Sequence, residues 1–206
     1  MMRPEIGDHK QLRPVVKHPE NSVNNLNISL FERLNDTGNC LLTKLREQHR
    51  MPSAIAAFPS KQYYGDSLVS RQQSPESLPA GFDWPSSDPI AFVNVYDEIG
   101  HEKGPGEDST SISNMTEASL VADIVAHFHT YGGKPKLSIS VVTFYSSQVQ
   151  AIESQLRAKR ADGAVSWVKT AESAQGLKDD IIIVSLVRSN SYGTLAFVKD
   201  FHYASA

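Results

Sequence analysis

Three segments of the sequence carry hydroxyl or amide side chains that could hold a phosphate-bearing ligand: residues 7–14, 143–148 and 170–176. Hydroxyl and amide groups can donate hydrogen bonds to phosphate oxygens. Each segment also has an ordinary structural interpretation, because Gly-Asp is a common turn, Ser-Ser a common helix cap and Gln-Gly a common loop end. Whether the three segments act together depends on the strands and helices that position them.

Regular apolar patterns surround the second and third segments. Runs rich in β-branched residues predict strands over residues 90–96, 137–145, 165–168 and 181–187. The last run shows no alternation, which is typical of a strand buried on both faces of a parallel sheet. Strands and helices alternate along this part of the chain, so we expect an α/β fold with a parallel sheet.

Two helices are expected between these strands. Asn114 and Glu117 have the spacing of a capping box, and an apolar stripe at helical spacing then runs to Phe128. Gly132 is expected to end this helix, and Gly163 to end the next one.

The site of a ligand-binding sheet of this class lies in the crevice at the carboxyl ends of its strands. Segments 143–148 and 170–176 directly follow predicted strands, whereas residues 7–14 follow only the stub of one. The sequence before residue 90 is richer in Pro, Ser, Asn and Gln. It predicts short helices over residues 28–34 and 40–45 and an extended connection over 67–89.

The composition excludes several classes of protein. Of 206 residues, 40% are hydrophobic and 21% charged, as in folded globular domains. A net charge of −3 excludes a wholly basic nucleic-acid coat protein but not a local basic groove. The single cysteine, Cys40, allows neither an internal disulfide nor a thiolate zinc site. Without a membrane-length apolar run or a secretory signal, the expected location is intracellular, in the cytoplasm or the nucleus.

Two clusters have a metal-like composition, and neither predicts a metal site. His127 and His129 would point roughly 200° apart on a helix, which favours solvated or packing roles. Asp97-Glu98 and Glu107-Asp108 could bind a cation, but a solvated acidic loop is the more common arrangement.

The polar segments, together with further blocks between them, closely resemble superfamily 1 helicases of the nonsense-decay (regulator of nonsense transcripts) group. Two of the blocks read Leu45-Arg-Glu-Gln-His-Arg-Met-Pro52 and Glu172-Ser-Ala-Gln-Gly176. All the blocks, in chain order, are residues 7–14, 29–34, 45–52, 58–68, 113–118, 143–148, 172–176, 180–189 and 193–200. They are collinear with the family over nearly the whole chain.

The resemblance implies an α/β RecA-like P-loop NTPase fold, in which helices flank a parallel sheet. It implies that residues 1–25 are the remnant of a first RecA-like domain, carrying helicase motif III. Residues 28–206 would then be a second RecA-like helicase domain that lacks its C-terminal end. Family members bind ATP and Mg²⁺ between the two domains and single-stranded RNA or DNA across both. The expected partners are therefore a single strand and the missing first RecA-like domain, with no membrane.

The resemblance also implies roles for individual residues. Gln11 would couple the γ-phosphate to nucleic-acid binding, and Arg50 would reach the γ-phosphate with its fixed guanidinium, so these two are the expected catalytic residues. Gln175 and Gly176 would join them in binding the nucleotide. The implied nucleic-acid contacts are side chains at strand ends, namely Thr143, Tyr145, Gln148, Thr170 and Ser173.

The sequence departs from the family at the nucleotide site. It contains no G-x-x-x-x-G-K-[ST] loop, and Lys178 stands where the family usually has the carboxylate that holds the ribose. The family's closing Arg-containing block is also missing after Asp200. We therefore expect that this chain alone does not hydrolyse ATP.

Two functions remain open at this point. The chain is either the C-terminal motor domain of an ATP-dependent superfamily 1 RNA/DNA helicase, or a catalytically inactive nucleic-acid- or protein-binding module derived from one. In the first case the intact protein would couple ATP hydrolysis to single-strand translocation.

Overall fold

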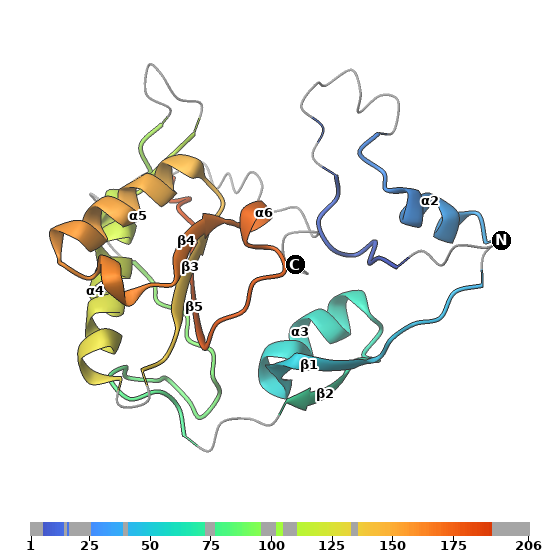
Figure 1. Cartoon of the computed structure of the whole chain (residues 1–206), viewed down its shortest axis with the longest axis horizontal. Helices are drawn as coiled ribbons and strands as arrows, with labels where there is room; N and C mark the ends of the chain where they lie inside the picture. Colours follow the sequence, from blue (N-terminus) through green and yellow to red (C-terminus); the bar gives the residue numbers. More distant parts are fainter. Residues whose placement is uncertain are drawn as a thin grey trace. The chain divides into compact units, whose positions relative to one another are not determined.

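The structure is a computed structural model that describes residues 6–14, 16, 26–38, 41–72, 77–95, 102–104, 111–132 and 136–190. The described residues up to 72 form one compact unit, and those from 77 to 190 form a second (Figure 1). Among these residues, no helix combines the length and the apolar character that crossing a membrane requires.

The second unit is built on a parallel three-stranded sheet. Strand β3 (Ile139–Thr143) lies in the centre, between β4 (Trp167–Thr170) and β5 (Ile181–Ser185). Both neighbours run parallel to β3. Parallel strands need crossover connections, and helices provide them here. The predicted α/β class, with a parallel sheet and flanking helices as in RecA-like domains, is confirmed.

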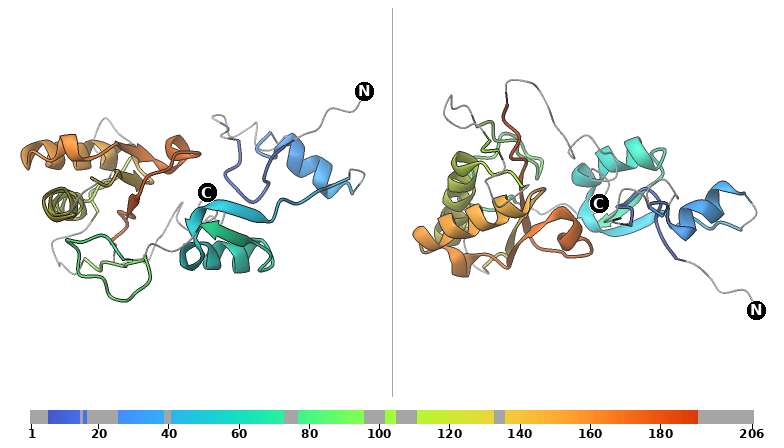
Figure 2. Two further views of the ribbon diagram at one scale, coloured as in Figure 1. Left: turned by 60° about the horizontal axis from the view of Figure 1, so that its bottom comes forward. Right: turned by 90° about the horizontal axis from the view of Figure 1, so that it is seen from above.

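Two long helices cover one face of this sheet. Helices α4 (Met115–Tyr131) and α5 (Ser146–Ala158) pack against each other and lie on the same side of the strands (Figures 1 and 2). Their apolar stripes and the facing strand residues form one buried core. It contains Ala118, Val121, Ala122, Val125, Phe128, Ile139, Val141, Ala151, Ile152, Leu156, Ala161 and Ile181.

Helix α4 and its apolar stripe are confirmed, but only one half of the predicted capping box forms. The Asn114 side chain accepts a hydrogen bond from the Glu117 amide, which satisfies a donor that the first turn leaves open. Every residue of the predicted stripe from Ala118 to Phe128 is buried. The helix ends at Tyr131, immediately before Gly132, as the glycine predicted.

Helix α5 ends earlier than predicted, and the placement of its end at Gly163 is wrong. Ala158 is the last helical residue, and Arg160 adopts a left-handed conformation with φ of 54°. Gly163 lies instead in a short 3₁₀ turn, η1 (Asp162–Ala164). A non-glycine residue makes the left-handed turn here, so glycine placement did not mark the helix end.

The predicted strand over residues 90–96 is also wrong over its described part. Residues 90–95 have no regular secondary structure, and Ile90, Phe92 and Val93 are exposed. β-branched and aromatic residues favour a strand only where a neighbouring strand and a packed face are available, and the structure gives residues 90–95 neither. Residue 96 and the acidic positions 97–98 and 107–108 lie outside the described residues.

Strand β5 is buried on one face only, contrary to the expectation from its continuous apolar run. Ile181 and Ser185 are buried, whereas Ile182 is 45% and Val184 52% exposed. The reason is the position of the strand: β5 is at the outside of the described sheet, and α4 and α5 cover only one side of it.

The first unit contains a smaller β-α-β arrangement. Strands β1 (Glu47–Pro52) and β2 (Val69–Gln72) are parallel, and α3 (Ser53–Tyr63) connects them and packs on both (Figure 1). Apolar periodicity did not predict these elements, because β1 is largely polar and α3 contains Pro59. Helix α2 (Leu30–Asp36) agrees with the predicted helix over 28–34. The helix predicted over 40–45 is wrong over its described part, because residues 41–45 have no regular secondary structure.

Candidate nucleotide and nucleic-acid sites

The carboxyl ends of the three strands in the second unit finish on a row of hydroxyl side chains. Thr143 is the register partner of Thr170 on β4 and of Ser185 on β5. We call Thr170, Thr143 and Ser185 the hydroxyl row. Two of the predicted nucleic-acid residues thus lie side by side at the edge of the sheet where ligands of such folds bind.

The predicted residues after β4 form one continuous turn. Thr170 is the N-cap of the single-turn helix α6 (Ala171–Ala174), and its hydroxyl lies 3.2 Å from that of Ser173. Gln175 and Gly176 follow directly, and Gly176 has φ of 84°, a conformation that favours glycine. Ser173, Gln175 and Gly176 are exposed and Thr170 is half-buried, so this turn is accessible to a ligand.

The predicted residues at the end of β3 and directly after it are buried instead. Thr143 is fully buried, and its hydroxyl oxygen has no hydrogen-bond partner among the described residues. Tyr145 packs with Ile112 and Val187, and burial raises the pKa of its phenol. Neither side chain offers a hydrogen-bond donor that a nucleic-acid strand could reach in this structure.

Gln148 uses both ends of its amide inside the fold. Its side-chain oxygen accepts a hydrogen bond from the backbone amide of Asn114 at 2.7 Å. Its side-chain nitrogen donates to the backbone carbonyl of Asn114 and to the Ser185 hydroxyl. The side chain is completely buried. Gln148 therefore ties the start of α5 to the start of α4 and to the end of β5. Direct contact between Gln148 and a nucleic-acid strand stays a prediction. The geometry favours a role for Gln148 in positioning the ends of α4, α5 and β5.

The backbone amide of Asn114 donates to Gln148 and not to Glu117, so the Glu117 carboxylate can accept other donors. In a full capping box that carboxylate would bind the N-cap amide. Here it accepts the backbone amides of Leu186 and Val187, each at 2.8 Å. Burial raises the pKa of Glu117 above its ordinary value, and the two amide donors oppose that rise.

The segment that leaves β5, residues 186–190, is held by a second carboxylate as well. We call it the exit segment. Glu102 accepts hydrogen bonds from the Arg188 guanidinium at 2.7 Å and from the Ser189 amide at 3.1 Å. The Glu102 and Arg188 side chains are only 15% and 12% exposed, so this ion pair is protected from solvent.

Gln11, in the first unit, lies in a turn organised by Asp8. One Asp8 oxygen accepts the Lys10 amide, and the other accepts the Gln11 side-chain amide and the Tyr64 hydroxyl. Burial, together with the Asp8 bond, raises the pKa of Tyr64. Close approach of Phe31 to Gly7 packs this segment on α2, since a Cβ on Gly7 would lie 3.1 Å from the Phe31 ring.

Arg50 lies on β1 at an irregularity of the strand. The register with β2 shifts between Gln48 and Pro52, as in a β-bulge. The Gln48 side-chain oxygen accepts the amides of Arg50 and Met51, so it replaces the missing ladder bonds. Arg50 is exposed at this bulge, where strands commonly redirect a side chain toward a ligand.

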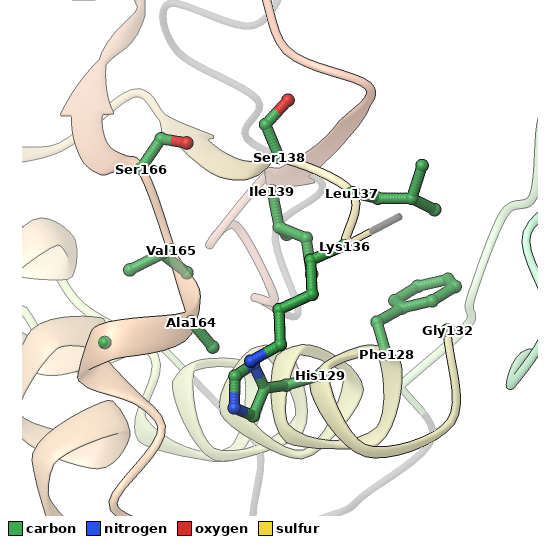
Figure 3. Close-up of a pocket in the computed structure, with 11 residues that line it drawn as sticks. Phe128, His129, Gly132, Lys136, Leu137, Ser138, Ile139, Ala164, Val165 and Ser166 are labelled. Atoms are coloured by element: carbon green, nitrogen blue, oxygen red, sulfur yellow. The ribbon is translucent and has the colours of Figure 1, made fainter. Parts of the chain in front are cut away.

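A cavity in the second unit lies away from the hydroxyl row of that unit. It has a volume of about 230 Å³ and is lined by residues that precede β3 and β4, among them Ser138, Val165 and Ser166 (Figure 3). These residues lie at the amino-terminal edge of the parallel strands, opposite the hydroxyl row. Lys136 and His129 border the cavity, whereas the His127 ring contacts Tyr131 instead. The two histidines thus have separate surroundings, and the described residues contain no cluster of three or more metal-ligating side chains.

Three important residues were not found from the sequence. Ser185 lies inside an apolar run. Glu117 was interpreted as part of a helix cap and of the block 113–118, and Gln48 as part of the block that contains Arg50, without a role for either side chain. The burial of Gln148 did have a signal, because it is four residues before Ile152 and eight before Leu156, on the apolar stripe of α5.

Comparison with known proteins places the chain in a family. The family described as "AAA domain" matches residues 26–204. The regulator of nonsense transcripts 1 homolog of Neurospora crassa is 33% identical, with 95% of this chain and 18% of the relative covered. The ATP-dependent helicase upf1 of Schizosaccharomyces pombe is 32% identical, with 95% and 21% covered.

A relative with a different printed activity is also similar. The DNA replication ATP-dependent helicase/nuclease dna2 of Schizosaccharomyces pombe is 30% identical, with 96% of this chain and 15% of the relative covered. The chain therefore spans about a fifth or less of the length of these proteins. Given the parallel sheet, the polar turn at its carboxyl edge and these similarities, the chain belongs to the AAA-domain family of superfamily 1 helicases of the nonsense-decay type.

Proposed function

We propose that this chain supplies the second RecA-like motor domain of an ATP-dependent helicase, coupling ATP hydrolysis to translocation along single-stranded RNA or DNA in the intact protein. The observation that supports this most is the turn 170–176. It places hydroxyl groups, an exposed amide side chain and an exposed glycine at the carboxyl edge of a parallel sheet. Such groups contact the phosphate backbone without selecting a sequence, as a translocating motor requires.

The nucleotide would be bound mainly by groups outside this chain. Gln11 and Arg50 are proposed to act on the γ-phosphate, and Gln175 and Gly176 to lie beside the nucleotide. When bound, ATP would supply the phosphoryl group, and Mg²⁺ would neutralise the charge on its phosphates. Lys178, at the position of the family's ribose carboxylate, is exposed here and close enough to Asp180 to help lower its pKa. We propose that this chain alone does not hydrolyse ATP, because it contains no phosphate-binding loop.

The test is binding of the full chain to fluorescently labelled single-stranded RNA and DNA, measured by anisotropy at two salt concentrations, with and without ATP. We expect salt-sensitive binding that ATP does not change, because released counterions drive contacts to phosphates. The Ser173→Asp variant should bind about tenfold more weakly, because it places a negative charge on the accessible turn.

A matched control is Thr130→Asp, which adds the same charge at an exposed position in the last turn of α4. Equal losses in the two variants would show that the turn has no special role. No binding at low salt by a folded chain would contradict strand binding. A chain that binds strands while the intact protein fails to hydrolyse ATP would support the alternative, an inactive binding module.

A further inference from the structure

The main chain of the exit segment has an unusual conformation at Val187. This residue has φ of 70°, in the left-handed region, and its side chain is completely buried. A β-branched residue rarely adopts such a φ, and the conformation persists only where the surroundings hold it in place. The groups that bind the main chain of Val187 therefore have a specific task.

Those groups come from the first turn of α4. The Glu117 carboxylate accepts the Leu186 and Val187 amides, and the Asn114 side chain donates to the Val187 carbonyl at 3.3 Å. The main-chain N–H and C=O of Val187 are thus both bound by the N-terminal end of α4. Asn114 and Glu117 are fixed in turn, since Asn114 caps α4 and is bound by Gln148.

This arrangement connects the exit segment to the hydroxyl row. Gln148 donates to Ser185, the last residue of β5, and Tyr145 packs against Val187. A movement of residues 186–187 would therefore disturb the ends of β3 and β5. Because Thr170 is the neighbour of Thr143, it would also reach the turn that follows β4.

We propose that Glu117 is a positioning residue for single-strand binding: through the amides of Leu186 and Val187 it fixes the exit segment, and with it the geometry of the carboxyl edge of the sheet. This inference rests on the proposed function. In this proposal Glu117 acts through the main chain of the exit segment and not by contact with nucleic acid.

The test uses the full chain in four forms: wild type, Glu117→Ala, Glu117→Gln and Glu153→Ala. Alanine removes both acceptors, whereas the glutamine oxygen retains one. Glu153 is a half-exposed glutamate on α5 whose ion pair with Arg157 spans 3.8 Å, so its replacement is the matched control. Each form is measured by hydrogen exchange of the Leu186 and Val187 amides, by thermal unfolding, and by binding to a labelled uridine oligonucleotide over a range of salt.

We expect faster exchange at Leu186 and Val187 in Glu117→Ala, with Val141 in the centre of the sheet still protected. Strand affinity of the folded fraction should fall about tenfold, and the salt slope should become shallower, because fewer phosphates are neutralised at once. Glu117→Gln should recover part of the affinity and of the slope. A loss of stability alone would leave the salt slope of the folded fraction unchanged.

Different results would overturn different statements. If Glu117→Ala exchanges faster at the exit segment but keeps the wild-type affinity and slope, the positioning role is wrong and strand binding stands. If exchange at Leu186 and Val187 does not change, Glu117 does not hold the segment and the inference is wrong. If Glu117→Ala does not fold, Glu117→Gln alone decides by the same criteria. If the folded wild type binds no strand, the proposed function and this inference are both wrong.

Discussion

The three hydroxyl groups of the hydroxyl row have different surroundings, although they share one register. Ser185 is bound by Gln148, and Thr170 lies beside Ser173 at the accessible turn. Thr143 is buried between them without a partner among the described residues. A buried hydroxyl that lacks a hydrogen bond costs stability. Two explanations are open: a bound ligand supplies the missing partner, or the fold tolerates the cost.

Replacing Thr143 by valine distinguishes these explanations. The substitution keeps the shape and removes the unpaired hydroxyl, so we expect the free energy of unfolding to rise by about 1 kcal/mol. Urea unfolding of the second unit, followed by tryptophan fluorescence, measures the change.

Strand affinity, measured on the same Thr143→Val protein, gives the functional side of the comparison. Weaker binding by the more stable variant would assign the hydroxyl to the ligand. A variant less stable than wild type would show that the hydroxyl has a partner in the folded chain.

The candidate residues could be predicted as a set from the sequence, but their individual surroundings could not. Gln148 follows a strand end, which is where an amide for a ligand is expected. Its actual partners, Asn114 and Ser185, are 34 and 37 residues away in the chain. A local pattern contains no information about such distant partners, so burial of this amide appears only in the folded structure.

At the scale of elements, local signals predicted what local forces determine. Helix α4 was predicted correctly because its cap and its apolar stripe lie within the helix itself. The run 90–96 has the residue types of a strand, but strand formation depends on a partner that residues 90–95 do not have here. Likewise, the exposed face of β5 depends on where the helices pack, which the run 181–187 does not encode.

The end of α5 offers a direct test of backbone conformation. Arg160 has a left-handed φ that glycine adopts without steric cost, so we expect Arg160→Gly to raise the free energy of unfolding by about 0.5–1 kcal/mol. Chemical denaturation measures it.

The matched change for Arg160 is Arg157→Gly, still within α5. There glycine should lower the free energy of unfolding by about 1 kcal/mol, because it adds backbone freedom to a helical position. Changes of the same sign at both positions would contradict the role of conformation.

The loop before β5 is attached to the start of β3 by an acidic residue. Asp180 accepts hydrogen bonds from the Ser138 amide and hydroxyl, and these bonds lower the pKa of its carboxyl below the ordinary value. A lowered pKa means that the ionised form stabilises the fold. This contribution is present above about pH 4 and is lost as the pH falls through the folded-state value.

Replacing Asp180 by asparagine should therefore reduce stability at neutral pH and leave it almost unchanged in acid. We expect a loss of at most about 1 kcal/mol near pH 7, since the carboxylate is largely exposed and screened. Urea unfolding across this pH range measures the difference, with exposed Asp162→Asn as the control. A loss that stays constant down to about pH 2 would contradict a contribution from the ionised form.

At the scale of the whole molecule, the chain divides into two compact units. Both tryptophans, Trp84 and Trp167, lie in the second unit, so tryptophan fluorescence reports on that unit alone. Helical circular dichroism reports on both units, because α2 and α3 belong to the first.

We therefore expect the two signals to give different unfolding midpoints in urea. Independent units do not unfold in one cooperative step, and non-coincident transitions are the usual sign of this. Superimposed curves at every denaturant concentration would show that the chain unfolds as one cooperative body.

The strand order β4-β3-β5 also has a consequence for how the chain is made. Ser138, just before the central strand, is joined to Asp180, just before β5, across 42 residues of sequence. Closing so long a loop precedes any gain from pairing, which makes such sheets slow to form. During synthesis β3 leaves the ribosome well before β5 has been made, and until then the β3 edge that pairs with β5 has no partner. The time between these two events sets how long the nascent chain depends on being shielded from other unfolded chains.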